Sequence, residues 1–335
     1  MPVARYTGSG GAGAEIADQV LDERVLALYA DGATLVLQGL HRTWPPLVEF
    51  AARLGVQLGC PVQVNAYLTP AGNRGFATHY DTHDVFVLQV AGRKQWRVHP
   101  PVLPDPLERQ PWGARAEEVE ATAAGPPVLE AELTPGDALY LPRGWLHSAR
   151  ALGERSLHLT LGLRRPTRYD LVEALLGLAA EEARLRAGFP MGLDLTEADQ
   201  LGPHLAATVD ALRAWLSTVD PHRVVERLRH RRWTACRPGP IRPVAQAEAA
   251  ATVDGDSLVA VRPGLCWRLT AGAPGRVALA LPDRTLDLPE FCAPAVRAAL
   301  GGPPVRVRDL PGLDVADSVV LVRRLLREAV VTPAE

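Results

Sequence analysis

The sequence predicts a mainly β domain of the double-stranded β-helix (jelly-roll) type, followed by a helical region and a small α+β domain. Three observations support this prediction. Short apolar segments alternate with Gly-, Pro- and Asp-containing turns up to residue 163. Apolar residues recur at helical spacing after Arg164-Arg165-Pro166. Strand-like and helix-like segments then alternate from about residue 250.

The length and composition fit a soluble protein of more than one domain. At 335 residues the chain exceeds one average domain, and its 47% hydrophobic and 22% charged residues are ordinary for globular proteins. A net charge of −2 does not favour binding of the whole chain to nucleic acid or membrane surfaces. We expect a barrel over 1–165, a helical region over 166–237 and a third domain over 245–335.

Several classes of protein are disfavoured. The N-terminus lacks the basic-then-apolar pattern of a secretory signal, and no run of 18 apolar residues predicts a membrane span. The four cysteines are widely spaced and form no CxxC pair, so neither a structural zinc site nor a disulfide framework is indicated. The expected location is the reducing cytoplasm.

The barrel strands are predicted from apolar segments between turn signals. One early helix should follow Trp44-Pro45-Pro46 and end near Gly59. The turn Ala91-Gly92-Arg93 predicts a hairpin, and the long segment from 100 to 127 is expected to be a loop, either a lid or an insertion. The expected strands are 34–37, 62–68, 76–81, 85–90, 94–98, 128–133, 138–141 and 156–163.

After the predicted barrel, the sequence pattern changes from strand-like to helical. Helical periodicity covers 169–187 and 208–233, and prolines then mark a linker. Five arginines between 223 and 232 could contact RNA or an acidic partner, but Glu226 favours a solvated helix face with internal pairing. Further on, the pattern predicts strands at 258–261, 266–269, 277–281 and 305–307, and helices at 294–300 and 316–328.

The candidate site begins at His79-Tyr80-Asp81. On an extended segment, His79 and Asp81 point to the same side, which places an imidazole beside a carboxylate. His147, after the strand 138–141 and a Pro-Arg-Gly turn, is the best candidate for a third ligand. Two histidines and one carboxylate leave coordination positions open, as Fe(II) needs when it binds a cosubstrate and O2.

Two alternatives remain open for this pattern. His83 could compete as a ligand, although we expect it in the surroundings of the site or at the surface. The three residues could also be ordinary polar residues of the barrel. Lys94 is the only lysine in a chain whose other basic residues are arginines, and it follows the His-x-Asp pair closely. A single lysine in a chain that otherwise uses arginine indicates a role for Lys94 that arginine cannot fill.

Two segments carry a specific resemblance. FATHYDTHDVFVLQVAGRKQWRV and LTPGDALYLPRGWLHSA resemble the ribosomal oxygenase group of JmjC proteins, which is related to the cupin-4 family. The resemblance implies an Fe(II)- and 2-oxoglutarate-dependent oxygenase that uses O2. It implies that His79, Asp81 and His147 bind iron and that Lys94 pairs with the distal carboxylate of 2-oxoglutarate.

The same resemblance implies roles for three further residues. Asn65 and Tyr67, in NAYLTP, match positions that line the cosubstrate or substrate pocket, and Thr160 could add a hydroxyl there. For Asn65 and Tyr67 a purely structural role in the strand is the alternative. Arg143 and Trp145 flank His147, where they could shape the substrate entrance; Trp145 could equally be a core residue.

The resemblance also implies the later domains and the substrate. The family places a helical dimerisation region and a winged-helix-like domain after the barrel, and RDLPGLD at 308–314 is similar to its last winged-helix connection. The expected protein is therefore a homodimeric hydroxylase of a ribosomal-protein His or Arg side chain, without direct nucleic-acid binding. Alternatives are the same chemistry on a peptide or small biosynthetic molecule, an N-methyl demethylase, and a non-catalytic interaction protein.

Overall fold

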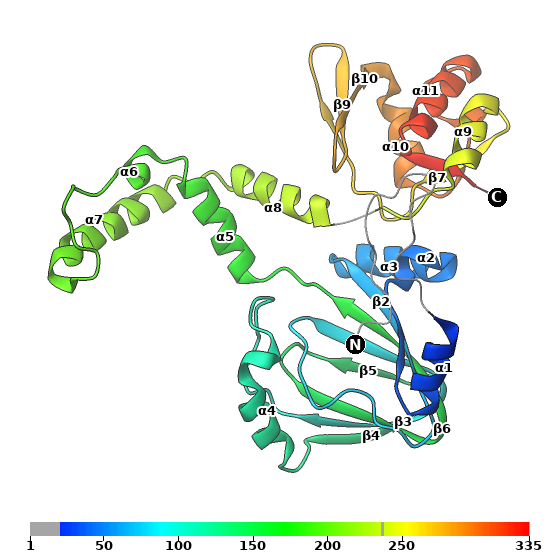
Figure 1. Ribbon diagram of the computed structural model, residues 1–335. Helices are drawn as coiled ribbons and strands as arrows, with labels where there is room; N and C mark the ends of the chain where they lie inside the picture. The colour runs from blue at the N-terminus through cyan, green and yellow to red at the C-terminus, as the bar shows by residue number, and fades with distance from the viewer. Residues whose placement is uncertain (1–20, 236–237, 335) are drawn as a thin grey trace. The chain divides into compact units, whose positions relative to one another are not determined.

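The chain divides into two compact units between Arg165 and Pro166. The computed structural model describes residues 21–235 and 238–334 (Figure 1). The first 20 residues of the expected barrel domain, residues 236–237 of the expected linker and residue 335 lie outside this description.

The first unit is built on an antiparallel sheet, as the sequence predicts. Its strands pair in the order β1-β2-β6-β3-β4, and β5 pairs with β3 (Figure 1). The strands are β1 (Leu35–Leu37), β2 (Val62–Thr69), β3 (Asp84–His99), β4 (Leu129–Leu133), β5 (Ala138–Leu141) and β6 (Leu146–Leu163). Because the long strands β3 and β6 run side by side, residues far apart in sequence become neighbours.

Strand β2 shows how alternation positions the site. Val62, Val64 and Ala66 are buried in the strand. Val62 and Val64 pack with Leu47 and Ala51 of the helix α3 (Pro45–Leu58) in one core cluster. Successive side chains of a strand point to opposite faces, so Asn65 and Tyr67 face the other way. The predicted helix is confirmed, with Pro45 at its first turn and Gly59 in a left-handed conformation at its end.

The predicted hairpin at residues 85–98 is wrong. These residues belong to the single strand β3, which pairs with β6 on both sides of an irregularity between Gln89 and Arg93. Gly92 has a φ of +62°, and a Cβ atom there would lie 2.1 Å from the carbonyl oxygen of Arg155. The glycine signal therefore marks a β-bulge instead of a chain reversal.

The bulge decides which side chains face the interior cavity. Before it, the odd-numbered Val85 and Val87 line the cavity; after it, the even-numbered Lys94 and Trp96 do. Since side chains alternate along a strand, a regular strand would have turned Lys94 to the opposite face. The irregularity therefore places the lone lysine at the cavity.

Two other expectations for the first unit are corrected. Residues 76–81 form no strand, because His79 makes only an isolated bridge and bends interrupt the segment. The expected loop at 100–127 contains the 3-10 helix η1 (Trp112–Arg115) and the helix α4 (Ala116–Ala123), whose buried Val119 packs with Tyr80 and Leu146. Two further early helices, α1 (Asp22–Ala30) and α2 (Leu40–Thr43), accompany α3.

The second unit begins with helices, as predicted, but a break divides each of the predicted stretches 169–187 and 208–233, and the second stretch starts at residue 198 instead of 208. They are α5 (Arg168–Ala179), α6 (Ala183–Arg186), α7 (Ala198–Leu216) and α8 (Pro221–Ala235). A small cluster joins α5 and α8 through Ala174, Leu178 and Val224. Within the described residues, no helix is long and apolar enough to cross a membrane.

The C-terminal part has its own large core and mixes helices with strands, as predicted. The sequence missed α9, β10 and β12, and placed β8 about two residues early. The elements are α9 (Pro243–Thr252), β7 (Leu258–Val261), β8 (Arg268–Ala271), β9 (Arg276–Ala280), β10 (Thr285–Pro289), η2 (Glu290–Cys292), α10 (Ala293–Gly301), β11 (Val305–Arg306), η3 (Val307–Asp309), α11 (Val315–Arg327) and β12 (Val331–Pro333).

The bulge in β3 generates a stability prediction. Gly92→Ala combines an unfavourable φ with a clash against the backbone at Arg155, and should lower the free energy of unfolding by about 3 kcal/mol or more. Gly153→Ala has the same φ of +62° but open space around its Cβ, and should cost only about 1 kcal/mol. Urea unfolding measures both variants, and equal losses would contradict the close approach at Gly92.

Candidate metal centre and ligand cavity

The structure brings His79, Asp81 and His147 together. One ligand atom from each lies within 4.8 Å of those of the other two, and the His147 Nε2 to Asp81 Oδ2 distance is 3.7 Å. His79 and Asp81 lie in the connection between β2 and β3, and His147 is the second residue of β6. A backbone bridge aligns the two histidines, with N···O distances of 2.8 and 3.2 Å.

Each histidine is oriented by a backbone carbonyl. Nδ1 of His79 donates to the Ala77 oxygen at 2.7 Å, and Nδ1 of His147 donates to the Trp145 oxygen at 3.1 Å. Because a carbonyl can only accept, both Nε2 atoms keep a free lone pair in the neutral imidazole. Burial, together with nearby His79, lowers the pKa of His147 to about 4, so this ring is neutral at physiological pH.

The other site candidates, His83, Arg143 and Trp145, lie outside the group of potential ligands. His83 lines the same cavity but is outside the group of three potential ligands. Trp145 is partly buried against a hydrophobic cluster and Arg143 pairs with Asp105. Neither Arg143 nor Trp145 is among the residues that line the cavity.

A cavity of about 340 Å³ is lined by the three potential ligands and by residues of β2, β3 and β6. The four residues predicted to bind cosubstrate all line it. Asn65 lies opposite Thr160, and Tyr67 opposite His158, in the pairing of β2 with β6. The Asn65 Oδ1 atom also accepts a hydrogen bond from the Gly39 backbone nitrogen at 3.0 Å, so this residue has a structural contact as well.

Lys94 is a buried cation with uncharged partners. It is 1% exposed, and its Nζ atom donates to Thr69 Oγ1 at 2.9 Å and to His158 Nδ1 at 3.2 Å. Burial lowers the pKa of Lys94 to about 8, and burial beside Lys94 holds the pKa of His158 well below its usual value. Among the described residues no carboxylate forms an ion pair with Lys94. A buried ammonium without an anion is costly, so this cavity is suited to an anionic ligand.

The sequence reasoning missed Thr69 and His158. The ring of His158 stacks on Tyr67, with centroids 4.9 Å apart and planes 10° from parallel. His158 precedes Thr160 by two residues on β6, so alternation alone places both on the same face. That spacing is a signal that could have identified His158 from the sequence.

Residues 46–171 match the family model described as the JmjC domain. Over these residues the chain is similar to a JmjC domain. Ribosomal oxygenase 1 of Rattus norvegicus is 38% identical over 198 residues, covering 56% of this chain and 31% of that protein. The bifunctional lysine-specific demethylase and histidyl-hydroxylase NO66 of Drosophila persimilis is 34% identical over 197 residues, covering 56% and 28%. The chain thus spans about a third of the length of these relatives.

Solved structures of YcfD from Escherichia coli resemble a larger part of the chain. One has a TM-score of 0.55 at 17% identity and covers 90% of this chain and 79% of that chain. YcfD described as a ribosomal oxygenase in complex with cobalt and 2-oxoglutarate has a TM-score of 0.52 at 17% identity, with 90% and 78% coverage. At this identity the likeness shows the fold. The resemblance to JmjC ribosomal oxygenases, which the motifs predicted, is confirmed.

The buried lysine predicts a stability cost that depends on pH. Lys94→Met removes the buried charge and should raise the free energy of unfolding at pH 7 by on the order of 2 kcal/mol, after subtraction of the lost hydrogen bonds. The folded pKa of about 8 lies below the ordinary 10.5, so the unfolded chain binds more protons between these values. Wild-type stability should therefore rise relative to Lys94→Met from pH 8 to 10.5. Urea unfolding across this range tests the sign, with Gln95→Met as the neighbouring control.

Proposed function

We propose that this chain is an Fe(II)- and 2-oxoglutarate-dependent oxygenase that hydroxylates a His or Arg side chain of a ribosomal protein. The observation that carries the proposal is one cavity lined both by a group of potential metal ligands and by a buried ammonium. Two imidazoles and a carboxylate converge in its lining, and the ammonium of Lys94 lies among uncharged partners in the same lining.

The residues fit the metal that this proposal requires. His79, Asp81 and His147 would hold Fe(II), since their free Nε2 atoms and the carboxylate form the 2-His-1-carboxylate set of non-haem iron oxygenases. When bound, the metal with 2-oxoglutarate and O2 supplies the oxidising chemistry that adds one oxygen atom to a C–H bond. The chain holds the ligands in position and keeps the site within a partly enclosed cavity.

The residues also fit a dicarboxylic cosubstrate. Lys94 would pair with the distal carboxylate of 2-oxoglutarate, and the charge-assisted hydrogen bond would compensate the buried ammonium. Asn65, Tyr67 and Thr160 would contribute an amide and two hydroxyls to the same cavity. Burial raises the pKa of Tyr67, which keeps its hydroxyl protonated as a hydrogen-bond donor.

The substrate assignment rests on the relatives. Their names describe ribosomal oxygenases and a histidyl-hydroxylase, which favours a ribosomal-protein side chain. The name of the Drosophila persimilis relative also includes lysine-specific demethylase, so an N-methyl demethylase is the second candidate. Intact-mass comparison of ribosomal proteins with and without the enzyme distinguishes them: a gain of one oxygen supports hydroxylation, whereas loss of a methylene with release of formaldehyde supports demethylation.

The later regions support further proposals. We propose that residues 166–237 mediate a homodimer, because several apolar side chains of the described helices remain exposed: Leu171, Val172, Leu176, Leu205, Leu216 and Val225. We propose a winged-helix-like fold for 245–335, where helices α10 and α11 accompany the antiparallel pair β9 and β10. The division of the chain after Arg165 supports the proposed barrel of 1–165.

Direct nucleic-acid binding is not part of this proposal. Three arginines of the basic helix α8 pair with glutamates, namely Arg223 with Glu181, Arg229 with Glu226, and Arg231 with Glu173. These pairs reduce the charge available to a polyanion. The proposed location is the cytoplasm, with a ribosomal protein or peptide as the partner.

Removal of a metal ligand should abolish activity. His79→Ala and Asp81→Ala each delete one potential iron ligand, so succinate formation from 2-oxoglutarate should fall below detection. His83→Ala is the matched control, because His83 lines the cavity outside the ligand group and its loss should leave Fe(II) bound. Retained turnover in His79→Ala or Asp81→Ala would remove the iron assignment.

Loss of the lysine charge should weaken cosubstrate binding. Lys94→Met should raise the apparent KM for 2-oxoglutarate by about tenfold or more, because it removes a charge-assisted contact worth about 1.5–3 kcal/mol. In the wild type, KM should increase as pH rises through about 8, where free Lys94 loses its proton. Steady-state succinate assays from pH 6.5 to 9.5 measure both effects. A saturation curve unchanged by Lys94→Met would place the distal carboxylate elsewhere.

A further inference from the structure

Asp84 is a buried carboxylate for which the proposed reaction has no direct use. Its side chain is 6% exposed and lies at the first residue of β3, three residues after the potential ligand Asp81. Burial alone would raise the pKa of Asp84, but donors at Arg143, Arg165 and Tyr140 outweigh this effect and lower the pKa. A carboxylate this buried and this well hydrogen-bonded is a fixed point in the structure.

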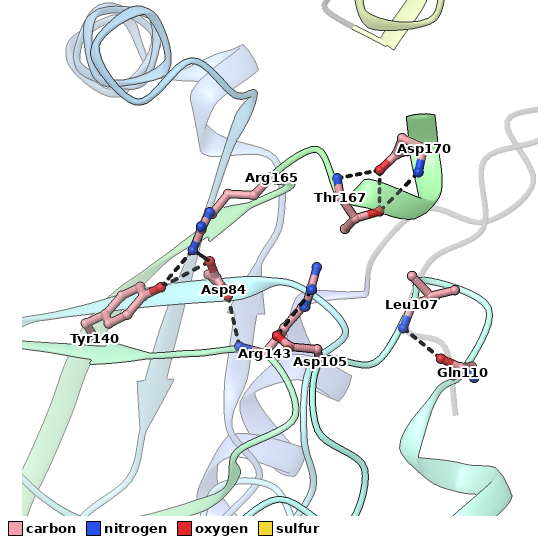
Figure 2. A network of polar contacts seen from close by, with 9 residues as sticks. All are labelled: Asp84, Asp105, Leu107, Gln110, Tyr140, Arg143, Arg165, Thr167 and Asp170. Atoms are coloured by element: carbon pink, nitrogen blue, oxygen red, sulfur yellow. Dashed lines mark hydrogen bonds and ion pairs between the residues drawn. The ribbon is translucent and has the colours of Figure 1, made fainter. Parts of the chain in front are cut away.

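The two oxygens of Asp84 hold different parts of the chain. Oδ2 accepts from Arg165 Nη1 at 2.8 Å and from the Tyr140 hydroxyl at 3.1 Å, whereas Oδ1 accepts from the backbone nitrogen of Arg143 at 3.0 Å. Figure 2 shows Asp84 between the Tyr140 and Arg165 side chains, with the Arg143 nitrogen on its other side. The bond to Arg143 reaches the turn between β5 and β6.

That turn carries His147 into the metal centre. Its next residue, Gly144, donates a backbone hydrogen bond to the carbonyl oxygen of Asp81 at 2.9 Å. Gly144 has a φ of +85°, and a Cβ there would lie 2.7 Å from the Leu103 oxygen, so the turn has little freedom to move. The turn is therefore bonded to Asp81 at one residue and to Asp84 at the adjacent one.

We infer that Asp84 is a positioning residue of the metal centre, whose carboxylate fixes the turn at Arg143 and thereby the spacing between Asp81 and His147. The inference rests on the proposed metal site. The two ligands are far apart in sequence, and Asp84 joins the segment that carries one to the turn that carries the other. Residues that orient metal ligands in this way commonly change metal affinity about 10- to 100-fold when they are replaced.

The test is Co2+ binding to the full-length, metal-free protein by isothermal titration calorimetry. Asp84→Asn should weaken Co2+ binding by about tenfold or more. The amide has only one acceptor oxygen, so it cannot accept hydrogen bonds at both positions as the carboxylate does. Asp137→Asn is the matched control: Asp137 accepts from the backbone and hydroxyl of Thr134 in another turn and does not contact Arg143. It should bind Co2+ as the wild type does. Wild-type affinity in Asp84→Asn would overturn the inference.

A second variant separates the two roles of Asp84, which bonds the turn at Arg143 through Oδ1 and the Arg165 side chain through Oδ2. Arg165→Gln removes the ion pair but leaves the bond from Arg143 to Oδ1 in place, so its Co2+ affinity should remain within about threefold of the wild type. A loss as large as that expected for Asp84→Asn would overturn the inference, and this outcome can be read even if Asp84→Asn fails to fold. A wild-type chain that binds no Co2+ would instead contradict the proposed function.

Discussion

The cavity is organised around one buried positive charge that the described residues do not neutralise. Lys94 hydrogen-bonds to a hydroxyl and to a neutral imidazole, and its lowered pKa records the cost of keeping an ammonium there. A core that served stability alone would favour an apolar residue at this position. The cost is reasonable if an anionic ligand occupies the cavity, and the proposed dicarboxylate cosubstrate meets that requirement.

Two long strands assemble the cavity around this charge. Strand β3 contributes Lys94 after its bulge, while β6 follows the turn at Arg143 and Gly144 and contributes His147, His158 and Thr160. Strand β2 adds Asn65 and Tyr67 by simple alternation. The register of one sheet thus sets most of the cavity lining, while His79 and Asp81 come from the connection between β2 and β3. Asp84 bonds the turn that precedes His147.

Local sequence patterns predicted much of this arrangement. The spacing of His79 and Asp81, the lone lysine and the position of His147 were sufficient to identify the group that the structure brings together. Apolar segments bounded by turn signals at 62–68 and 156–163 likewise predicted strands that the structure contains. These features are visible because they depend on short periodicities and on residue chemistry.

The errors arose where long-range contacts override local signals. Gly92 suggested a hairpin, but the close approach of the Arg155 backbone makes it a bulge in a continuous strand. Residues 76–81 looked like a strand, although they make only one isolated bridge, between His79 and His147. Thr69 gains its importance through its hydrogen bond to Lys94, a partner distant in sequence.

The most direct test of the central claim is a crystal structure of the chain with Co2+ and 2-oxoglutarate. The account predicts Co2+ bound by His79, Asp81 and His147, with the distal carboxylate of 2-oxoglutarate within hydrogen-bond distance of Lys94 Nζ. A metal bound by other residues, or a distal carboxylate held by an arginine while Lys94 keeps only its uncharged partners, would contradict it.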